Sequence, residues 1–291
     1  MKKLLCVLVC MVFLSGVFAV TVSADTGPKP SVRITLEGLG DELCYGTLLS
    51  KVKSTGPQSA WDGDPRNAQH DQNEHYGGGL DYDVWKAFVD YDDADGYYFL
   101  QCAWRVDQTK QLNWTYYPPA SFKVLLYFPQ TNSFVVSEIN ERYAFDSYYT
   151  VSVSANGTLS AARSYDFSWE IISLLVRIII TVLIELGLAV VFDYASKKQL
   201  LLLLGVNTIT QVALNIILNA VNYTSGHQAF VSNYIVLELA IFAVEGILYY
   251  HFLDNSAKKK KRAFTLLYAL IANTASFAAG FAIAKLLPGI F

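Results

Sequence analysis

The sequence predicts a mixed fold, in which an extracellular β-rich, sandwich-like domain is followed by an α-helical bundle that crosses a membrane four times. Apolar and polar side chains alternate with period two in the first half of the 291-residue chain, as in half-buried strands. Four apolar segments in the second half are long enough to span a bilayer. Charged residues form only 16% of the chain, and the mean hydropathy is +0.30. This composition excludes a wholly disordered chain and a nucleic-acid binder held by bulk positive charge.

Residues 1–24 have the pattern of a secretory signal peptide. Lys2 and Lys3 form a basic start, an apolar run follows at 4–20, and small residues predict cleavage after Ala24. The apolar run is long for a signal peptide, so an uncleaved membrane anchor is the alternative. The signal peptide predicts that the residues after it are exported.

Residues 25–168 form the predicted extracellular β-rich domain. Alternation is clear at 32–36, while 97–106 and 122–128 are richer in aromatic and β-branched residues, as more buried strands are. The only helix candidate lies at 82–91. We therefore expect an antiparallel sandwich or a related β-rich fold.

Cys44 and Cys102 are the two cysteines that remain after the signal peptide is removed. An exported domain can keep a disulfide, and closing the long loop between them would stabilise the domain by roughly 3–4 kcal/mol. Two buried free thiols are the alternative.

The stretch between residues 62 and 95 is rich in aspartate, glutamate and glycine, and it contains the weak metal-ligand candidates His70, Asp71, Glu74 and His75. An oxygen-rich loop could hold Ca²⁺, and the histidines could add a borderline metal. The spacing matches neither an EF-hand loop nor a zinc signature. We therefore predict no metal and no cofactor, and we expect solvated turns.

Tryptophans and tyrosine doublets recur through the same domain. Exposed aromatic rings would suit sugars or a partner protein. Packing in a sheet core explains the rings at least as well. The aromatic content is a hint of a binding face and no more.

Four spans are expected in the second half, at residues 169–192, 199–222, 229–253 and 263–287. Lys197 and Lys198 lie in the first connection and the basic run 258–262 in the third, whereas the second connection, 223–228, has neither lysine nor arginine. The positive-inside rule then places the first and third connections in the cytoplasm. Residues 25–168 and the carboxyl terminus are predicted to be extracellular, on a multi-pass protein of the plasma membrane.

Polar residues inside the predicted spans are the chief functional clue, because each is costly in hydrocarbon and usually faces the bundle interior. They are Arg177, Glu185, Asn207, Gln211, Asn215, Asn219, Glu238, Glu245 and Asn273. Counted from the outer boundary, Arg177, Asn215 and Glu238 lie at one depth. We expect an Arg177–Glu238 ion pair capped by Asn215, which acts chiefly to hold helices together.

Glu185, Asn207 and Glu245 lie at a second, deeper level, with two carboxylates, an amide and no fixed cation. Like-charged carboxylates in a medium of low dielectric constant share a proton or hold a cation. Contacts that simply join helices are the alternative, although two acids without a base suit that role poorly.

The arrangement resembles an uncharacterised group of bacterial envelope proteins with a signal peptide, an aromatic-rich outer domain and a four-helix carboxyl-terminal membrane module. The resemblance lies in the segment from Arg177 to Glu185, in the amide series from Asn207 through Gln211 to Asn219, and in Glu238 with Glu245. No activity is known for that group. The resemblance therefore implies an architecture and no function.

Several catalytic motifs are absent from the sequence. It contains no Gly-rich phosphate loop, His-Glu-x-x-His, Cys-x-x-Cys or Gly-x-Ser-x-Gly. ATPase, zinc protease and serine hydrolase activities therefore lack support, and an enzyme is not predicted.

Two functional hypotheses follow. In the first, the outer domain binds a ligand, wall polymer or envelope protein partner and is coupled to the polar bundle. In the second, the protein is a cation- or proton-conducting, permease-type subunit that uses Glu185 and Glu245, alone or as a homo-oligomer. A purely structural anchor is a weaker third reading. The lipid bilayer is a partner in each of them, and nucleic acid in none.

Overall fold

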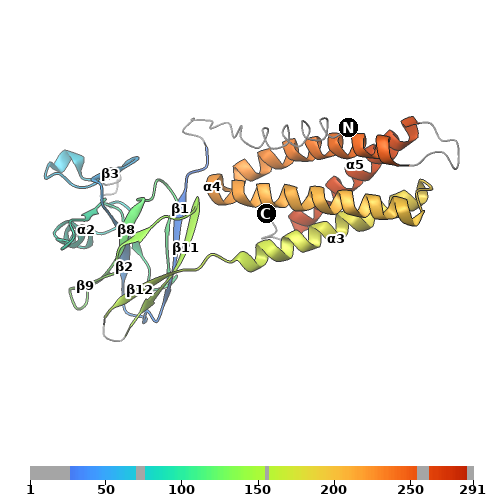
Figure 1. Cartoon of the computed structure of the whole chain (residues 1–291). Helices are drawn as coiled ribbons and strands as arrows, with labels where there is room; N and C mark the ends of the chain where they lie inside the picture. Colours follow the sequence, from blue (N-terminus) through green and yellow to red (C-terminus); the bar gives the residue numbers. More distant parts are fainter. Residues whose placement is uncertain (1–26, 70–75, 155–156, 254–261, 287–291) are drawn as a thin grey trace. The chain divides into compact units, whose positions relative to one another are not determined.

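The computed structural model describes residues 27–69, 76–154, 157–253 and 262–286 (Figure 1). The chain divides into a β-rich unit, Gly27–Tyr165, and a helical unit that begins at Asp166. The predicted order, a β-rich domain followed by helices, is confirmed. The predicted signal peptide at 1–24 and the metal-ligand candidates His70, Asp71, Glu74 and His75 lie outside the described residues.

The first sheet of the β-rich unit has four strands in the order β12-β11-β1-β7. Their bounds are Ser31–Glu37 for β1, Gln111–Trp114 for β7, Asp146–Val153 for β11 and Leu159–Arg163 for β12. β1 pairs with β7 in antiparallel orientation but with β11 in parallel orientation. We expected an antiparallel sandwich or a related β-rich fold. The β-rich fold is confirmed, but this pair is parallel, because the chain builds the whole second sheet before it returns beside β1 in the same direction.

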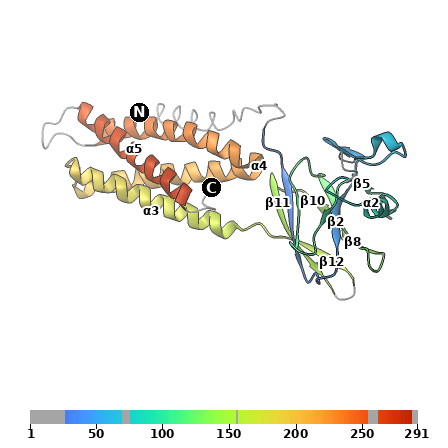
Figure 2. The same ribbon diagram turned by 180° about the vertical axis from the view of Figure 1, so that it is seen from behind.

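The second sheet has six strands, of which β10-β8-β2-β5 form the main order, β6 pairs with β2 and β9 pairs with β8 (Figure 1, Figure 2). The strands are β2 at Tyr45–Ser50, β5 at Tyr98–Phe99, β6 at Trp104–Arg105, β8 at Ser121–Phe128, β9 at Ser133–Val136 and β10 at Asn140–Glu141. A small hairpin, β3 at Ser54–Thr55 and β4 at Gln58–Ser59, precedes the short 3-10 helix η1 at Pro65–Asn67. The helix α2, Tyr82–Val89, lies within the predicted 82–91.

Two hydrophobic cores lie on opposite faces of the second sheet. Val124 and Leu126 of β8 pack with Ile34 of β1 between the two sheets. Leu125 of β8 packs with Phe88 of α2 on the other face. Both faces of β8 are thus buried, which explains why its sequence is apolar at most positions and does not alternate, with Lys123 as a buried exception.

The aromatic residues of the β-rich unit serve mainly these cores. Trp114 belongs to the core between the sheets, and Trp85 packs in the core under α2. Tyr82, Tyr116 and Tyr148 are exposed and come from different elements. The core-packing alternative accounts for both buried tryptophans.

A buried lysine neutralises part of the acidic stretch. Lys123 of β8 is 4% exposed, and its Nζ lies 2.8 and 3.0 Å from the two carboxylate oxygens of Asp93 and 2.5 Å from Asp95 Oδ2. Asp93 Oδ2 also accepts the backbone N–H groups of Asp95 and Tyr97. Burial alone would lower the pKa of Lys123, but its hydrogen bonds to Asp93 and Asp95 raise it. The loop after α2 is thereby fixed to the middle of the second sheet.

Cys44 and Cys102 are free, buried thiols in the core between the sheets. The structure has both thiols free, as in the second of the two alternatives, and we keep this alternative as a prediction. Burial raises the pKa of each thiol to about 12. Both thiols are therefore protonated at neutral pH.

We expect Cys44 and Cys102 of the native full-length protein to react with a maleimide far more slowly than an exposed cysteine, because the thiolate is the reactive form. After unfolding in denaturant without a reductant, both should be alkylated, which peptide mapping by mass spectrometry would show. Two cysteines that stay unlabelled until a reductant is added would demonstrate a disulfide and contradict this expectation.

The helical unit contains α3, Phe167–Val191, α4, Lys197–Phe252, and α5, Arg262–Leu286. Each of these three helices is long and apolar enough to cross a membrane. The second and third predicted spans are joined in the single 56-residue element α4, and the predicted connection at 223–228 remains helical except at Gly226.

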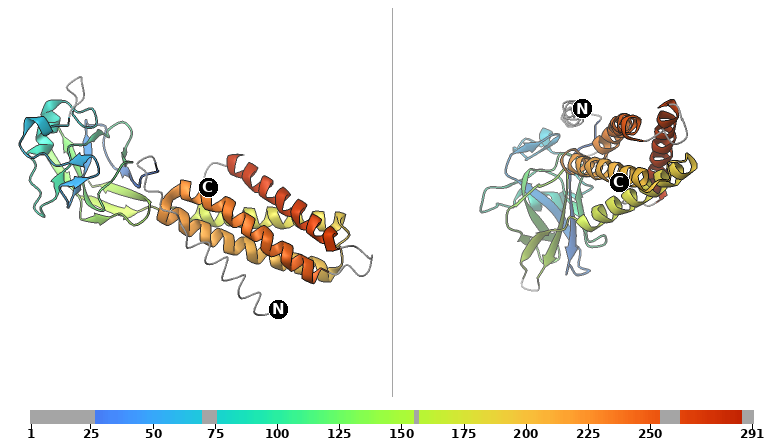
Figure 3. Two further views of the ribbon diagram at one scale, coloured as in Figure 1. Left: turned by 90° about the horizontal axis from the view of Figure 1, so that it is seen from above. Right: turned by 45° about the vertical axis from the view of Figure 1, so that its right-hand side comes forward.

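Gly226 reverses the direction of α4. Its backbone has φ 80° and ψ 176°, outside the helical region. Asn207 Nδ2 lies 2.9 Å from Tyr249 Oη, and Thr210 Oγ1 lies 2.6 Å from Glu245 Oε1, so residues 42 and 35 positions apart are in contact. The two halves of α4 therefore run antiparallel, side by side (Figure 3).

The helical unit has an apolar exterior and an interior in which polar side chains lie among two hydrophobic clusters. Large apolar side chains such as Leu183, at 64% exposure, and Ile209, at 70%, point outward. Glu185, Asn207 and Glu245 are at most 1% exposed. This distribution is the reverse of that in a water-soluble bundle and is consistent with insertion into a membrane.

Candidate functional site

Polar side chains recur every four residues along the inward faces of α3 and the first half of α4, because positions four apart lie on one face of a helix. On α3 the buried series runs through Arg177, Thr181 and Glu185. On α4 it runs through Leu203, Asn207, Gln211 and Asn215, and on the second half of α4 through Tyr234, Leu237, Ile241, Glu245 and Tyr249. The helix period thus directs the polar groups of separate helices into a common interior.

The inner polar cluster is formed by six residues of α3, α4 and α5: Glu185, Asn207, Thr210, Glu245, Asn273 and Ser276. Glu245 Oε1 accepts a hydrogen bond from Thr210 at 2.6 Å, and Glu185 Oε1 accepts one from Ser276 at 3.4 Å. Asn207 lies next to Glu185, and Asn273 lies next to Glu245. The structure therefore brings together residues that are up to 91 positions apart in the chain.

Two tyrosines close this cluster. Tyr249 Oη accepts a hydrogen bond from Asn207 Nδ2 at 2.9 Å, and Tyr268 of α5 donates one to the main-chain oxygen of Glu185 at 3.1 Å. Both rings are fully buried. They separate the carboxylates from the surroundings of the bundle at this level.

Three acceptor atoms of the inner polar cluster are buried without a hydrogen-bond partner among the described residues: Glu185 Oε2, Glu245 Oε2 and Asn207 Oδ1. Glu185 and Glu245 also repel each other electrostatically. A buried acceptor without a donor costs about 1–3 kcal/mol, and more if it is charged. The arrangement therefore favours a positive charge or a proton at this position.

A bound divalent metal is poorly supported at the inner polar cluster. In the described part of the chain, no three His, Cys, Asp or Glu side chains come together as metal ligands would. Ca²⁺ requires six to eight oxygen ligands and Mg²⁺ a near-octahedral set. The inner polar cluster offers two carboxylates, two amides and two hydroxyl groups, without a third acidic, histidine or cysteine ligand among the described residues.

The outer polar cluster consists of Arg177, Gln211, Asn215, Tyr234 and Glu238. Arg177 donates to Asn215 Oδ1 at 3.4 Å, and its guanidinium lies 5.6 Å from the centre of the Tyr234 ring. Glu238 is hydrogen-bonded by Tyr234 and attracted electrostatically by Arg177. Asn215 thus lies beside Arg177 as expected. Tyr234 contacts both predicted ion-pair partners, Arg177 through its ring and Glu238 through a hydrogen bond.

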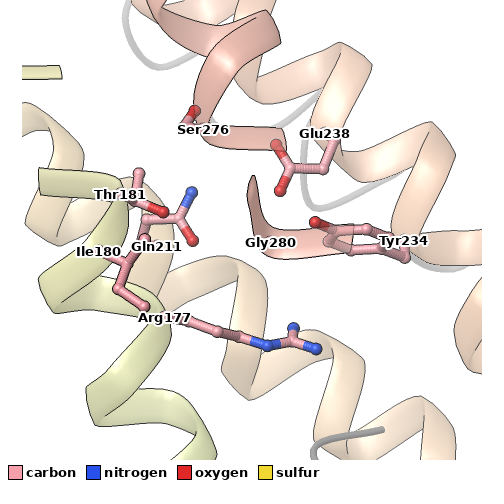
Figure 4. A pocket seen from close by; sticks show the side chains of 8 residues that line it. All are labelled: Arg177, Ile180, Thr181, Gln211, Tyr234, Glu238, Ser276 and Gly280. Carbon is pink, nitrogen blue, oxygen red and sulfur yellow. The ribbon is translucent and has the colours of Figure 1, made fainter. Parts of the chain in front are cut away.

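A small cavity of about 10 Å³ lies within the outer polar cluster (Figure 4). Its lining residues are Arg177, Ile180, Thr181, Gln211, Tyr234, Glu238, Ser276 and Gly280. In Figure 4 the Glu238 carboxylate and the Tyr234 hydroxyl face Gln211 across the cavity, while the Arg177 guanidinium extends below the Tyr234 ring.

Two of the predicted site residues contribute fewer contacts to the site. Asn219 is half-buried and makes no side-chain hydrogen bond within the described part of the chain. Asn273 is buried and donates to the main-chain oxygen of Ala269 at 3.1 Å, so its amide is partly used inside its own helix.

The sequence analysis missed the hydroxyl groups of the site, those of Thr210, Tyr234, Tyr249, Tyr268 and Ser276. Thr210 lies three residues after Asn207, and Tyr234 lies four residues before Glu238, so both share a helix face with a predicted residue. These spacings place Thr210 and Tyr234 on the polar faces of their helices, but they do not say which carboxylate each hydroxyl meets.

Comparison of the chain with protein-family models, with curated protein sequences and with solved structures finds no match. The function must therefore be argued from the residues of the site.

Proposed function

We propose that the protein conducts protons across a membrane and that Glu185 and Glu245 share the transported proton. The observation that carries the proposal is the group of three buried, unpartnered acceptor oxygens on Glu185, Glu245 and Asn207. A single proton turns one carboxylate oxygen into a donor, which a neighbouring acceptor can receive. One proton shared by two of these oxygens would give both a partner and would remove the repulsion between two negative charges.

In this proposal the protein crosses the plasma membrane four times, once with α3, once with each half of α4, and once with α5. The reversal at Gly226 and the apolar exterior support this arrangement, and each half of α4 exceeds the roughly 20 residues that a span requires. Lys197, Lys198 and Arg262 lie at the helix starts on one side of the bundle, which favours a cytoplasmic position for these ends. The β-rich unit and the carboxyl terminus are then extracellular.

The first functional hypothesis, a ligand, wall polymer or partner bound by the outer domain, remains a prediction for the β-rich unit. The described geometry favours the second hypothesis, because three unpartnered acceptor oxygens lie together in the helical unit, on Glu185, Asn207 and Glu245. The unit that conducts the proton is either a single copy of the protein or a homo-oligomer, and both remain part of the proposal.

The test is proton flux into vesicles. The full-length protein is reconstituted into liposomes that contain a pH-sensitive dye, and a potassium diffusion potential drives proton entry. We expect the double change Glu185→Gln and Glu245→Gln to reduce the flux to that of protein-free vesicles, because a glutamine pair cannot exchange a proton.

The matched control is Glu138→Gln, which makes the same chemical change at an exposed position of the β-rich unit. It should leave the flux unchanged. A wild-type flux equal to that of empty vesicles, or a double variant that conducts like the wild type, would contradict the proposal. A flux of Na⁺ or K⁺ that needs both glutamates and no proton would instead identify a monovalent cation as the transported species and also overturn it.

A further inference from the structure

We infer that the cavity of the outer polar cluster is the route by which a proton reaches Glu185, with Glu238 as the entry group and Ser276 as the connecting residue. This inference rests on the proposed function and adds a direction of access to it. It is carried by one juxtaposition: Ser276 belongs to both clusters, since it lines the cavity and its hydroxyl lies within hydrogen-bond distance of Glu185 Oε1, at 3.4 Å, and of the main-chain oxygen of Asn273, at 3.1 Å.

The cavity suits a water molecule. Its volume of about 10 Å³ is close to the smallest that holds one water, and such a water needs two to four polar partners. Thr181, Gln211, Tyr234, Glu238 and Ser276 provide hydroxyl, amide and carboxylate groups around it. A site of this size with this polar lining favours a water over an empty void.

Glu238 is the group of the cavity that can load a proton. Its side chain is half-buried, whereas Glu185 is 1% exposed, so Glu238 is the carboxylate nearer to the surroundings. Tyr234 hydrogen-bonds the carboxylate at the cavity wall, and the Arg177 guanidinium, beyond the Tyr234 ring, adds an electrostatic attraction.

The transfer balances without a further reactant. Protonated Glu238 gives its proton to the cavity water, and the water gives a proton to Oγ of Ser276 as the Ser276 hydroxyl proton passes to Glu185 Oε1. Glu238 becomes a carboxylate, Glu185 becomes a carboxylic acid, and the water and the serine end as they began. The proton on Glu185 can then be shared with Glu245.

Gly280 allows the cavity to be narrowed without a change in charge. A Cβ at Gly280 would lie 3.1 Å from Tyr234 Oη, which is tighter than ordinary contact, so the hydroxyl would have to move within the cavity. A Cβ at Gly205 of α4 meets nothing within 4 Å. Gly280→Ala and Gly205→Ala are therefore a matched pair of variants.

The experiment measures the rate of proton flux and the protonation of Glu185 separately, on the full-length protein in lipid. The vesicle assay gives the flux, and infrared spectroscopy follows the carboxylic acid band that disappears in Glu185→Gln. We expect Ser276→Ala, Glu238→Gln and Gly280→Ala each to slow the flux by at least about tenfold, because each interrupts the relay. The carboxylic acid band should persist in all three, and Gly205→Ala should change neither quantity.

The outcomes separate the inference from the proposed function. A flux that is lost in the double glutamine variant but normal in Ser276→Ala and Glu238→Gln would overturn the route and leave the function standing. A double glutamine variant that conducts normally would overturn both. Loss of the carboxylic acid band in Ser276→Ala would show that the serine holds the pair in place and does not relay, which also overturns the route.

Discussion

Lys123→Met is expected to lower the free energy of unfolding of the β-rich unit by about 3–5 kcal/mol, since removing one partner of a buried ion pair leaves the other charge uncompensated. Asp93 would lose two hydrogen bonds, at 2.8 and 3.0 Å, inside the second sheet. Methionine fills a similar volume, so the loss reflects charge and not a cavity. The expected effect approaches the whole stability of many domains.

Hydrogen–deuterium exchange of β2 and β8 amides in the full-length protein measures this loss. Lys53→Met, at an exposed lysine, is the control and should cost less than about 1 kcal/mol. Adding Asp93→Asn to Lys123→Met should restore part of the loss, because an asparagine oxygen can still accept the N–H groups of Asp95 and Tyr97. Equal exchange in Lys123→Met and Lys53→Met would contradict the role given to the buried pair.

Gly226→Ala is the second change with a large expected effect. The backbone of Gly226, at φ 80° and ψ 176°, lies in a region that residues with a Cβ essentially do not occupy, and forcing one there costs about 1–3 kcal/mol. The reversal of α4 brings Thr210 to Glu245, so strain at Gly226 also threatens the inner polar cluster. We therefore expect a less stable helical unit and a reduced proton flux.

Gly205→Ala is the matched control within the same helix. Its added Cβ has free space, and alanine favours a helix over glycine by about 1 kcal/mol, so this variant should be as stable as the wild type or more so. An SDS titration of the full-length protein in mixed micelles, followed by circular dichroism, compares the two. If Gly226→Ala unfolds at the same SDS fraction as Gly205→Ala, the reversal does not depend on a glycine.

Much of the fold follows from periodicity in the sequence, and its exceptions have physical reasons. The apolar run at 122–128 predicts a buried strand, and β8 is buried on both faces because a sheet and a helix cover it. The parallel pairing of β1 with β11 was not predictable, since parallel and antiparallel strands have the same alternation. The reversal between the second and third spans was predicted at 223–228, but its restriction to the single residue Gly226 was not, because hydropathy is averaged over many residues.

The sequence predicts which face of each helix carries the polar residues of the site, because these residues recur at helical spacing. The spacing of Arg177 and Glu185 on α3 and of Asn207 and Asn215 on α4 placed these side chains toward an interior. Which hydroxyl groups meet them depends on how the helices rotate against one another. Thr210 and Ser276 could therefore not be assigned to the carboxylates before the structure was known.

The parallel pairing of β1 with β11 has a consequence for biosynthesis. The hydroxyl of Ser31 hydrogen-bonds the carboxylate of Asp146, 115 positions later, so the central strand of the first sheet gains its neighbour only near the end of the unit. Contacts between such distant positions form slowly and late. During synthesis from the amino terminus, β1 therefore cannot pair with β11 until almost the entire unit has been made. A chaperone that binds β1 in that interval must release it before the first sheet can be completed.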